Sequence, residues 1–327
     1  MAANDVARLW FHDARAAPLG AGHIHDTFLV TVGSARYVMQ RINEHVFQDA
    51  EAMLATTAQV LHRWQRQKEY RAPELMRAPG GAAAIRVDGE LWRLWRYLEG
   101  TRVVDPLRSA AQIEAAGAAF GTFQRVMREF PDVPADPIAG YMQLSHYLAE
   151  FDSVRQNAPP DLQRLIAEHQ PLASALGDRN TLIHGDCKVN NLLYDVASDT
   201  VAAIIDFDTV MQGHWAWDLG DLVRSVCYSR GSCDVDAFAQ CVSGFARGSA
   251  DTRFPGDFRQ AAIAPMYVSL MLGVRFLTDH LQGDRYFRVA EPGQNLRRAM
   301  EQFDLFQQFL NVEEKLMREA ESIFAER

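Results

Sequence analysis

The chain has 327 residues, 48% of them hydrophobic, and carries a formal net charge of −9 with an isoelectric point near 5.6. This length exceeds what one hydrophobic core usually supports and predicts two lobes with a cleft between them. The acidic charge argues against a nucleic-acid-binding protein, which would normally carry a basic face, and favours small-molecule chemistry.

The cysteines and the N-terminus bear on the cellular context. Cysteines stand at positions 187, 227, 233 and 241 without C-x2-C spacing, so a structural zinc site or a disulfide framework has little support. The N-terminal residues include Asp5 and lack the apolar core of a signal peptide, and no segment approaches about eighteen uninterrupted apolar residues. We therefore expect a soluble cytoplasmic protein with reduced thiols.

Strand-like segments dominate the first part of the chain. Residues 27–32 and 36–42 alternate around a Gly33-Ser34 turn, which indicates a β-hairpin. The loop before it contains Gly20 and Gly22, whose backbone can approach a phosphate closely. Short glycine-rich turns are more often only turns, so this loop is a weak signal by itself.

A helix and a second hairpin follow. Apolar residues recur at helical spacing from Phe47 to Trp64 and predict an amphipathic helix. Residues 83–87 and 91–98 flank an Asp88-Gly89 turn and predict the second hairpin.

The rest of the chain is predicted to be helical. We expect a hinge at Glu99-Gly100, which gives lobes of residues 1–98 and 99–327. An apolar stripe from Ile113 to Met127, with Ser109 in position to cap it, predicts the first helix. A strand-rich lobe followed by an all-helical lobe is typical of a bilobal α+β fold. Further helices are expected over residues 138–155, 160–176, 217–229, 235–247, 257–282 and 293–323.

One stretch carries the strongest chemical signal. His184-Gly185-Asp186 is followed by Asn191, and the apolar run 201–205 ends in Asp206-Phe207-Asp208. An aspartate five residues before an asparagine can place a carboxylate at a hydroxyl nucleophile and an amide oxygen at a metal. The second aspartate supplies another oxygen ligand, as Mg²⁺ requires. Either tripeptide alone is more often a turn or a strand end, but together they favour a phosphoryl-transfer centre.

This stretch resembles the catalytic loop of the aminoglycoside phosphotransferase and choline kinase superfamily, H-G-D-x4-N followed by I-D-F or I-D-L. The resemblance implies a protein-kinase-like fold with a nucleotide-binding N-terminal lobe and a larger catalytic lobe, and it implies ATP and Mg²⁺ as cofactors. It also implies that Asp186 is the catalytic base, that His184 supports the loop, and that Asn191 and Asp206 hold Mg²⁺ while Asp208 reaches a second metal. Asp218, within a W-D-L-G segment, would steady the loop as a buried acceptor.

The same resemblance implies a nucleotide site in the N-terminal lobe. Kinases carry a phosphate-binding lysine in a V-A-I-K pattern, and this chain has Val38-Met39-Gln40-Arg41 in its place. Either Arg41 binds the nucleotide phosphates in place of the lysine, or Gln40 faces the nucleotide. The alternative is that Arg41 is only a solvent-exposed arginine on an edge strand. Glu51 would orient Arg41 through an ion pair, or it simply favours a helix N-terminus. The implied nucleotide-binding residues are Gly20, Gly22, His23, Thr27, Gln40, Arg41, Glu51, Arg96, Tyr97 and Leu98, the last three through their backbone.

Several segments between about residues 19 and 310 resemble N-acetylhexosamine 1-kinases within this superfamily, including 22–28, 37–43, 206–210 and 275–279. His25 departs from an asparagine of that group. The resemblance implies phosphorylation of the anomeric hydroxyl of an N-acetylhexosamine. Arg275 and Asp279 are four residues apart and could share a helix face. The candidate acceptor-binding residues are Asp26, Asp186, Arg224, Arg275 and Asp279.

Other functions remain open at this point. A kinase of another small hydroxyl compound, such as an aminoglycoside, an amino alcohol or homoserine, would share the catalytic loop. The mixed charges of residues 275–298 suit a neutral, hydroxyl-rich ring better than a polycation. A nucleotide-binding pseudokinase is favoured by the missing lysine and opposed by the intact catalytic loop. A phosphohydrolase ranks last, because few histidines stand near the acidic residues. The expected partners are a nucleotide and a small sugar, with no nucleic acid and no membrane.

Overall fold

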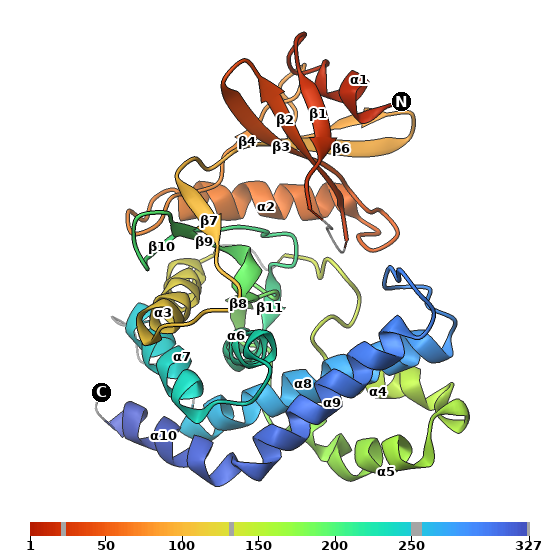
Figure 1. The fold of residues 1–327 in the computed structure, drawn as a ribbon, viewed down its shortest axis with the longest axis vertical. Coiled ribbons are helices and arrows are strands. Elements are labelled where there is room, and N and C mark those ends of the chain that lie inside the picture. The colour runs from red at the N-terminus through yellow and green to blue at the C-terminus, as the bar shows by residue number, and fades with distance from the viewer. Residues whose placement is uncertain (21–23, 131–133, 250–256, 326–327) are drawn as a thin grey trace. The chain divides into compact units, whose positions relative to one another are not determined.

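The structure, a computed structural model, describes residues 1–20, 24–130, 134–249 and 257–325. The chain divides into two compact units, Met1–Gly100 and Thr101–Arg327 (Figure 1). An antiparallel sheet dominates the first unit and helices dominate the second, which confirms the predicted α+β fold class.

The elements of the first unit are α1 (Ala3–Ala7), β1 (Arg15–Pro18), β2 (Asp26–Val32), β3 (Ala35–Arg41), α2 (Ala50–Trp64), β4 (Leu75–Met76), β5 (Ile85–Val87) and β6 (Glu90–Arg96). They build one antiparallel sheet in the order β1-β2-β3-β6-β4, and β5 also pairs with β6. Both predicted hairpins are present, as β2–β3 and β5–β6. The sequence analysis missed α1 and β1, because segments of four or five residues carry little periodic signal.

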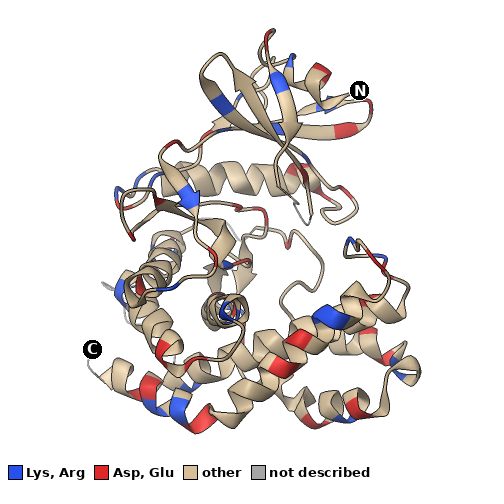
Figure 2. Cartoon of the chain, viewed as in Figure 1, with Lys and Arg blue, Asp and Glu red and all other residues tan. Residues whose placement is uncertain are grey.

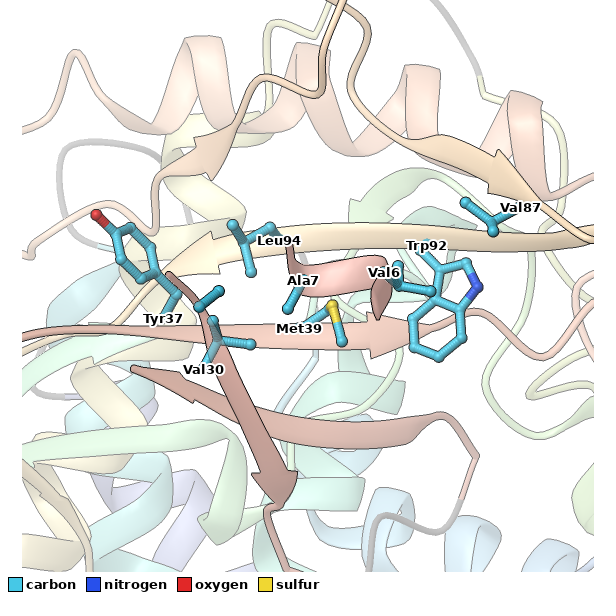
Figure 3. Close-up of a cluster of buried hydrophobic side chains, with 9 residues drawn as sticks. Val6, Ala7, Val30, Tyr37, Met39, Val87, Trp92 and Leu94 are labelled. Carbon is cyan, nitrogen blue, oxygen red and sulfur yellow. The ribbon is translucent and has the colours of Figure 1, made fainter. Parts of the chain in front are cut away.

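One face of this sheet carries the hydrophobic core of the first unit. Alternate residues of β3 and β6, namely Tyr37 and Met39 with Trp92 and Leu94, form this core with residues of α1 (Figure 3). Because successive side chains of a strand point to opposite faces, the intervening residues of both strands lie on the other face of the sheet.

Helix α2 confirms the predicted helix that follows the first hairpin. The Asp49 carboxylate caps its start by accepting a hydrogen bond of 2.9 Å from the backbone amide of Ala52. At its end the fully buried Trp64 stacks on Tyr70, with ring centroids 6.0 Å apart. The helix therefore buries its apolar side within the first unit.

The second unit is mainly helical, which agrees with the predicted kinase-like fold, and it contains short strands that the expectation of an all-helical lobe left out. A three-stranded sheet has the order β10-β9-β7, and β8 pairs with β11. The apolar run that forms β10 was expected to be a strand, and it pairs with nearby β9, whereas β7 and β8 pair with distant segments, which a local pattern does not show. The elements are β7 (Thr101–Val103), α3 (Ala110–Met127), α4 (Leu144–Asp152), η1 (Arg155–Asn157), α5 (Pro160–His169), η2 (Gln170–Ser174), β8 (Thr181–Ile183), η3 (Val189–Asn191), β9 (Leu192–Asp195), β10 (Val201–Ile204), β11 (Met211–Gly213), α6 (Trp215–Arg230), α7 (Val235–Gly248), α8 (Phe258–Leu281), α9 (Gln294–Asn311) and α10 (Glu313–Ala325).

Helices α3 and α7 pack at very short range. A Cβ atom added at Gly117 or Gly121 of α3, or at Gly244 or Gly248 of α7, would come within 2.1–2.4 Å of a backbone oxygen of the other helix. Glycine at these four positions therefore permits the contact. Ser109 caps α3 as predicted, within a complete capping box.

Helix α8 is the longest helix described. By length and composition alone it could span a membrane, but 83% of its most apolar window is buried inside the structure. The predicted helix over residues 293–323 is two helices, α9 and α10, which are interrupted at Val312. Figure 2 shows residues of both charges interspersed along α9 and α10.

Candidate active site

Asp218 of α6 holds the loop between β8 and β9. Its carboxylate accepts hydrogen bonds of 2.9 Å from the backbone amides of His184 and Gly185 and from Gln124 Nε2. Asp218 is fully buried, and these three bonds offset the cost of burying its charge. The structure confirms the predicted role of Asp218 as a buried acceptor that steadies the loop.

His184 and Gly185 shape the same loop. His184 Nε2 lies 3.2 Å from the carbonyl oxygen of Ile205, at the end of β10, and the His184 ring packs edge-on against Phe123. Gly185 has a φ of 79°, and a Cβ there would lie 2.6 Å from the carbonyl oxygen of Thr209. Only glycine fits this turn, which presents the next residue, the predicted base.

Asp186 is nearly buried, with 9% of its surface exposed. Its Oδ2 lies 2.9 Å from Lys188 Nζ and accepts a hydrogen bond of 2.8 Å from Asn191 Nδ2. Burial by itself raises the pKa of Asp186, but Lys188 and the Asn191 amide favour the carboxylate more strongly, so the pKa lies below its ordinary value. Asp186 is therefore charged at neutral pH, as an acceptor for a hydroxyl proton must be.

Lys188 is a site residue that the sequence analysis did not single out. Besides pairing with Asp186, its ammonium is within electrostatic reach of Asp206 and Asp221. Burial lowers the pKa of Lys188, but the carboxylates outweigh burial, and the pKa is raised above its ordinary value. The signal for this residue is its place two positions after the motif aspartate, on the same short loop.

Asn191 and Asp206, the implied metal ligands, lie on adjoining segments. The backbone amide of Ile205 donates a hydrogen bond of 3.0 Å to the Asn191 carbonyl oxygen. Because Asn191 Nδ2 donates to Asp186, the side-chain oxygen of Asn191 is the atom that would bind a cation. Asp206 is exposed and has a φ of 67°, a strained conformation for a non-glycine residue that often marks a functional site.

These donors suit Mg²⁺, which proteins usually bind through one or two carboxylates while phosphates and water complete the octahedron. Asn191 and Asp206 supply two hard oxygen atoms of this kind. Asp208 is only 2% exposed, which favours Asp206 as the ligand. Across the described ranges, 1–20, 24–130, 134–249 and 257–325, no group of three or more His, Cys, Asp or Glu side chains is arranged to hold a metal ion.

Asp221 and Arg224 form a buried ion pair in α6. Arg224 Nε and Nη2 each lie 2.9 Å from Asp221 Oδ1, and both side chains are 7% exposed. Burial raises the pKa of Asp221, and nearby Asp186 adds to this rise, while Arg224 opposes it; the net direction is upward. Since Asp221 already engages Arg224, a contact to an acceptor would use the remaining N–H groups of the guanidinium.

Asp279 is bound to the segment that follows α8. Its carboxylate accepts hydrogen bonds of 2.7–3.0 Å from the backbone amides of Arg285, Tyr286 and Phe287 and from Asn295 Nδ2. Four bonds fill the accepting capacity of a carboxylate. The geometry therefore gives Asp279 a supporting role in place of the expected direct contact with the acceptor.

Tyr141 connects Arg275 with the catalytic loop. The Tyr141 hydroxyl is within electrostatic reach of Asp186, Asp221 and Arg275. Arg275, one turn before Asp279 on α8, is 8% exposed. Arg224 and Arg275 thus each have a neighbour, Asp221 and Tyr141 respectively, within electrostatic reach of Asp186.

In the first unit, Thr27, Gln40 and Arg93 form a row across β2, β3 and β6. They are register partners, and Gln40 Oε1 accepts a hydrogen bond of 2.9 Å from Arg93 Nε. Arg93 is 1% exposed, and its guanidinium lies 5.1 Å from the centroid of the Trp95 ring. Arginine is rarely this buried. The sequence analysis missed it, although it interrupts the apolar strand Leu91-Trp92-Arg93-Leu94-Trp95.

Arg41 points to the other face of the sheet. It lies on the same side as Met39 of the core, pairs with Asp26 and lies 3.8 Å from Glu90. Asp26, expected at the acceptor, is therefore an ion-pair partner of Arg41. Gln40 therefore lies on the sheet face that carries Thr27 and Arg93, and Arg41 lies on the opposite face.

Of the two readings of Glu51 that the sequence left open, the structure favours a helix N-terminus over an ion pair with Arg41, which pairs with Asp26 instead. Glu51 lies in the first turn of α2 with its carboxylate 3.7 Å from Arg86, so a favourable place at a helix N-terminus accounts for it.

His25 is buried, and its Nδ1 accepts a hydrogen bond of 3.1 Å from the Asn43 backbone amide.

The remaining nucleotide candidates of the first unit are Arg96 at the end of β6 and residues outside its helices and strands. The backbone amides of Arg96 and Tyr97 donate to the carbonyl oxygens of Glu74 and Arg36 at 2.9 and 3.1 Å, so a contact to a base would use their carbonyl oxygens. Leu98 follows them before the unit boundary. Gly20 has a φ of 66°, a conformation that glycine adopts easily. Gly22 and His23 lie outside the described residues.

The sequence profile of a family described as "Phosphotransferase enzyme family" matches residues 15–251. This range includes the loop of Asp186, the metal candidates and Asp218. The chain belongs to this phosphotransferase family.

One curated relative matches only in part. This phosphotransferase is 21% identical over 240 residues to a probable acyl-CoA dehydrogenase of Arabidopsis thaliana, and the match covers 67% of this chain and 28% of that protein. The chain thus spans less than a third of that relative's length, and we do not assign the dehydrogenase activity in the relative's name to this chain.

Solved structures share the fold of this phosphotransferase over most of its length. A microcompartment-associated aminopropanol kinase has 18% identity and a TM-score of 0.69, covering 94% of this chain and 98% of that one. An aminoglycoside phosphotransferase from Alicyclobacillus acidocaldarius has 16% identity and a TM-score of 0.65, covering 94% and 92%. A spectinomycin phosphotransferase in complex with ADP and spectinomycin has 13% identity and a TM-score of 0.58, covering 95% and 92%. These likenesses confirm the predicted kinase-like fold, and the family profile identifies the chain as a phosphotransferase.

Proposed function

We propose that this phosphotransferase uses ATP and Mg²⁺ to phosphorylate the anomeric hydroxyl of an N-acetylhexosamine, giving the sugar 1-phosphate in the cytoplasm. The observation that carries the kinase chemistry is the loop in which charged, nearly buried Asp186 contacts Lys188 and Asn191 while Asp218 holds the loop backbone. The aspartate is thereby oriented and kept deprotonated before any substrate arrives.

In the proposed reaction, a carboxylate oxygen of Asp186 accepts the proton of the acceptor hydroxyl as the new O–P bond forms. No covalent enzyme intermediate is needed. Lys188 stabilises negative charge on the phosphoryl group in transfer. Mg²⁺, held through Asn191 and Asp206, would neutralise charge on the nucleotide phosphates. The rate enhancement then comes mainly from positioning and electrostatics.

For the nucleotide, we propose that Arg93 binds the phosphates in place of the kinase lysine, a role for which the sequence analysis left Arg41 and Gln40 open. Arg93 is a permanent cation on the sheet face that also carries Thr27 and Gln40, whereas Arg41 is paired with Asp26 on the other face. An adenine nucleotide is supported by the ADP complex of the spectinomycin phosphotransferase. The backbone of residues 96–98 would contact the base.

For the acceptor, a sugar is supported by the segments that resemble N-acetylhexosamine 1-kinases and by the arginines near Asp186. The N–H groups of Arg224 and Arg275 suit hydroxyl and acetamido oxygens, which are hydrogen-bond acceptors. A small amino alcohol or an aminoglycoside is the second candidate, because the solved relatives are named for such acceptors.

An acceptor screen tests the proposal. The enzyme is incubated with ATP, Mg²⁺ and one of N-acetylglucosamine, N-acetylgalactosamine, kanamycin, choline, aminopropanol or homoserine, and ³¹P NMR locates the phosphate. We expect a sugar 1-phosphate, recognised by coupling of phosphorus to the anomeric proton. Phosphorylation of one of the last four compounds, with neither sugar used, would overturn the acceptor and leave the kinase assignment standing.

A further inference from the structure

Four aromatic rings surround Arg275 in the second unit. The guanidinium carbon lies 4.6 Å from the ring centroid of Tyr147, 5.2 Å from those of Tyr141 and Phe287, and 5.4 Å from that of Tyr286. We call Arg275 with these four rings the arginine box. Contacts of this length with several rings hold a cation by cation–π attraction.

The box has two walls, Tyr141 with Tyr147 on one side and Tyr286 with Phe287 on the other. Helix α8 carries Arg275 and also positions both walls. Near one wall, Tyr267 of α8 accepts a hydrogen bond of 2.9 Å from the Leu144 amide and donates one of 3.0 Å to the Met142 carbonyl oxygen, which fixes the segment between Tyr141 and Tyr147. On the other wall, Asp279 of α8 binds the backbone amides of Tyr286 and Phe287. The box is therefore built before any ligand binds.

Apart from a hydrogen bond with Tyr141, the charge of Arg275 has no counter-charge beside it, and one hydroxyl of the box has no partner in the described chain. Among the residues that the structure describes, no carboxylate forms an ion pair with Arg275. Burial lowers the pKa of Arg275, but its tyrosine neighbours outweigh burial, and the guanidinium stays charged. The Tyr147 hydroxyl is buried and has no hydrogen-bond partner in the described chain. Buried polar groups left in this way point to a ligand.

The box adjoins the site of chemistry, because the Tyr141 hydroxyl is within electrostatic reach of both Arg275 and Asp186. Aromatic boxes typically bind ammonium groups of ligands. In this chain a cation of the protein itself fills that place.

We propose that Arg275 makes the box reject acceptors that carry an ammonium group and select acceptors whose hydroxyl or carbonyl oxygens bind its N–H groups. This inference rests on the proposed kinase function and narrows the substrate class by charge. It also separates this enzyme from the solved relatives named for aminopropanol and aminoglycosides, both of which are amines.

Two substitutions of Arg275 test the box without relying on turnover. Arg275→Ala empties the box, and Arg275→Met refills it with an uncharged chain. We expect Arg275→Ala to bind tetramethylammonium in an NMR titration at low millimolar concentration, while the wild type and Arg275→Met do not. A second change in the empty box, Tyr147→Leu, should remove this binding. Arg259→Met is the matched control, because Arg259 also lies over a ring, that of Phe258, but is exposed.

Kinetics supply the second readout. Loss of a hydrogen bond from a charged donor typically costs enough to raise the acceptor KM on the order of tenfold to a hundredfold. We expect this rise in Arg275→Met with kcat within a few-fold of wild type, and a much smaller rise in Arg275→Lys, which keeps the charge. The comparison of Arg275→Met with Arg275→Lys tests the inference even if Arg275→Ala does not fold.

Two results would overturn the inference: tetramethylammonium binding by the wild type, or equal acceptor KM values for Arg275→Met and Arg275→Lys. If neither N-acetylhexosamine is phosphorylated but emptying the box still creates an ammonium site, the proposed acceptor fails and the role of Arg275 stands.

Discussion

Replacing Asp186 by asparagine keeps the shape of the side chain and removes its ability to accept a proton. A positioned general base typically contributes about 10²–10⁴-fold, so kcat should fall by that factor while nucleotide affinity stays close to wild type. Steady-state kinetics and nucleotide titration check this, with exposed Asp178→Asn as the control. A variant that keeps more than about a tenth of wild-type kcat would show that Asp186 is not the base.

Lys188 controls the protonation of Asp186. In the wild type the pKa of Asp186 is depressed, so the active carboxylate is present above that pKa and is lost as the pH falls through it. Lys188→Met removes the nearby cation while burial remains, and the pKa of Asp186 should rise. The acid limb of the kcat/KM profile should therefore move to higher pH, and Lys188→Arg should restore it. An unmoved acid limb in Lys188→Met would contradict this coupling.

At the scale of single residues, the sequence located what a fixed spacing defines. Asp186 and Asn191 were named from the H-G-D-x4-N spacing, and Asp206 and Asp218 from two short motifs that follow it in the chain. Lys188 was missed although it stands two residues after Asp186, its ion-pair partner. Arg93 was missed because its partner, Gln40, lies on a neighbouring strand and the contact is tertiary.

The pleat of the sheet in the first unit decides which arginine meets the nucleotide. Gln40 and Arg93 share one face, and Arg41 lies on the other. Arg93→Met should raise the KM for ATP on the order of tenfold or more and Arg41→Met much less, since each variant loses one charged donor but only Arg93 would face the phosphates in the proposed site. Nucleotide kinetics of both variants test the order. The reverse order would mean that the nucleotide uses the other face, because a one-residue shift changes the side of every side chain.

The crossing of α3 and α7 predicts a purely structural effect. A methyl group at Gly121 would lie 2.1 Å from the Phe245 carbonyl oxygen, so the helices must separate in Gly121→Ala. Overpacking of this kind typically costs about 1–3 kcal/mol, and the free energy of unfolding should drop by that amount. Urea denaturation measures it, with Ser243→Ala on α7 as a control that adds no bulk. Equal stability of Gly121→Ala and wild type would show that the crossing can relax.

At the scale of elements, hairpins and long helices could be predicted because their period repeats several times. The short strands β7, β8 and β11 could not, since each has three residues and forms only by pairing with a distant segment. The single helix expected over residues 293–323 is interrupted at Val312. The apolar pattern continues through this position, so the pattern alone does not reveal the interruption.

For the whole molecule, the proposed tasks divide between the two units. The first unit carries the Thr27, Gln40 and Arg93 row, and the second carries the base, the metal candidates and the arginine box. A kinase and a pseudokinase would both bind nucleotide through such a fold, so binding and turnover must be measured on the same preparation.

Thermal unfolding with and without ligands makes that distinction. A ligand at a hundred times its Kd adds about 2.7 kcal/mol of stability, which for a chain of this size should raise Tm on the order of 5 °C. We expect ATP with Mg²⁺ to raise Tm more than ATP alone, because Asn191 and Asp206 would hold the cation and the cation would neutralise charge on the nucleotide. Asn191→Ala and Asp206→Ala should lose the part of the rise that depends on Mg²⁺ and keep the part due to ATP. Full retention of the Mg²⁺ increment in both variants would remove these residues as ligands. A rise in Tm without ATP consumption in the acceptor screen would favour the pseudokinase.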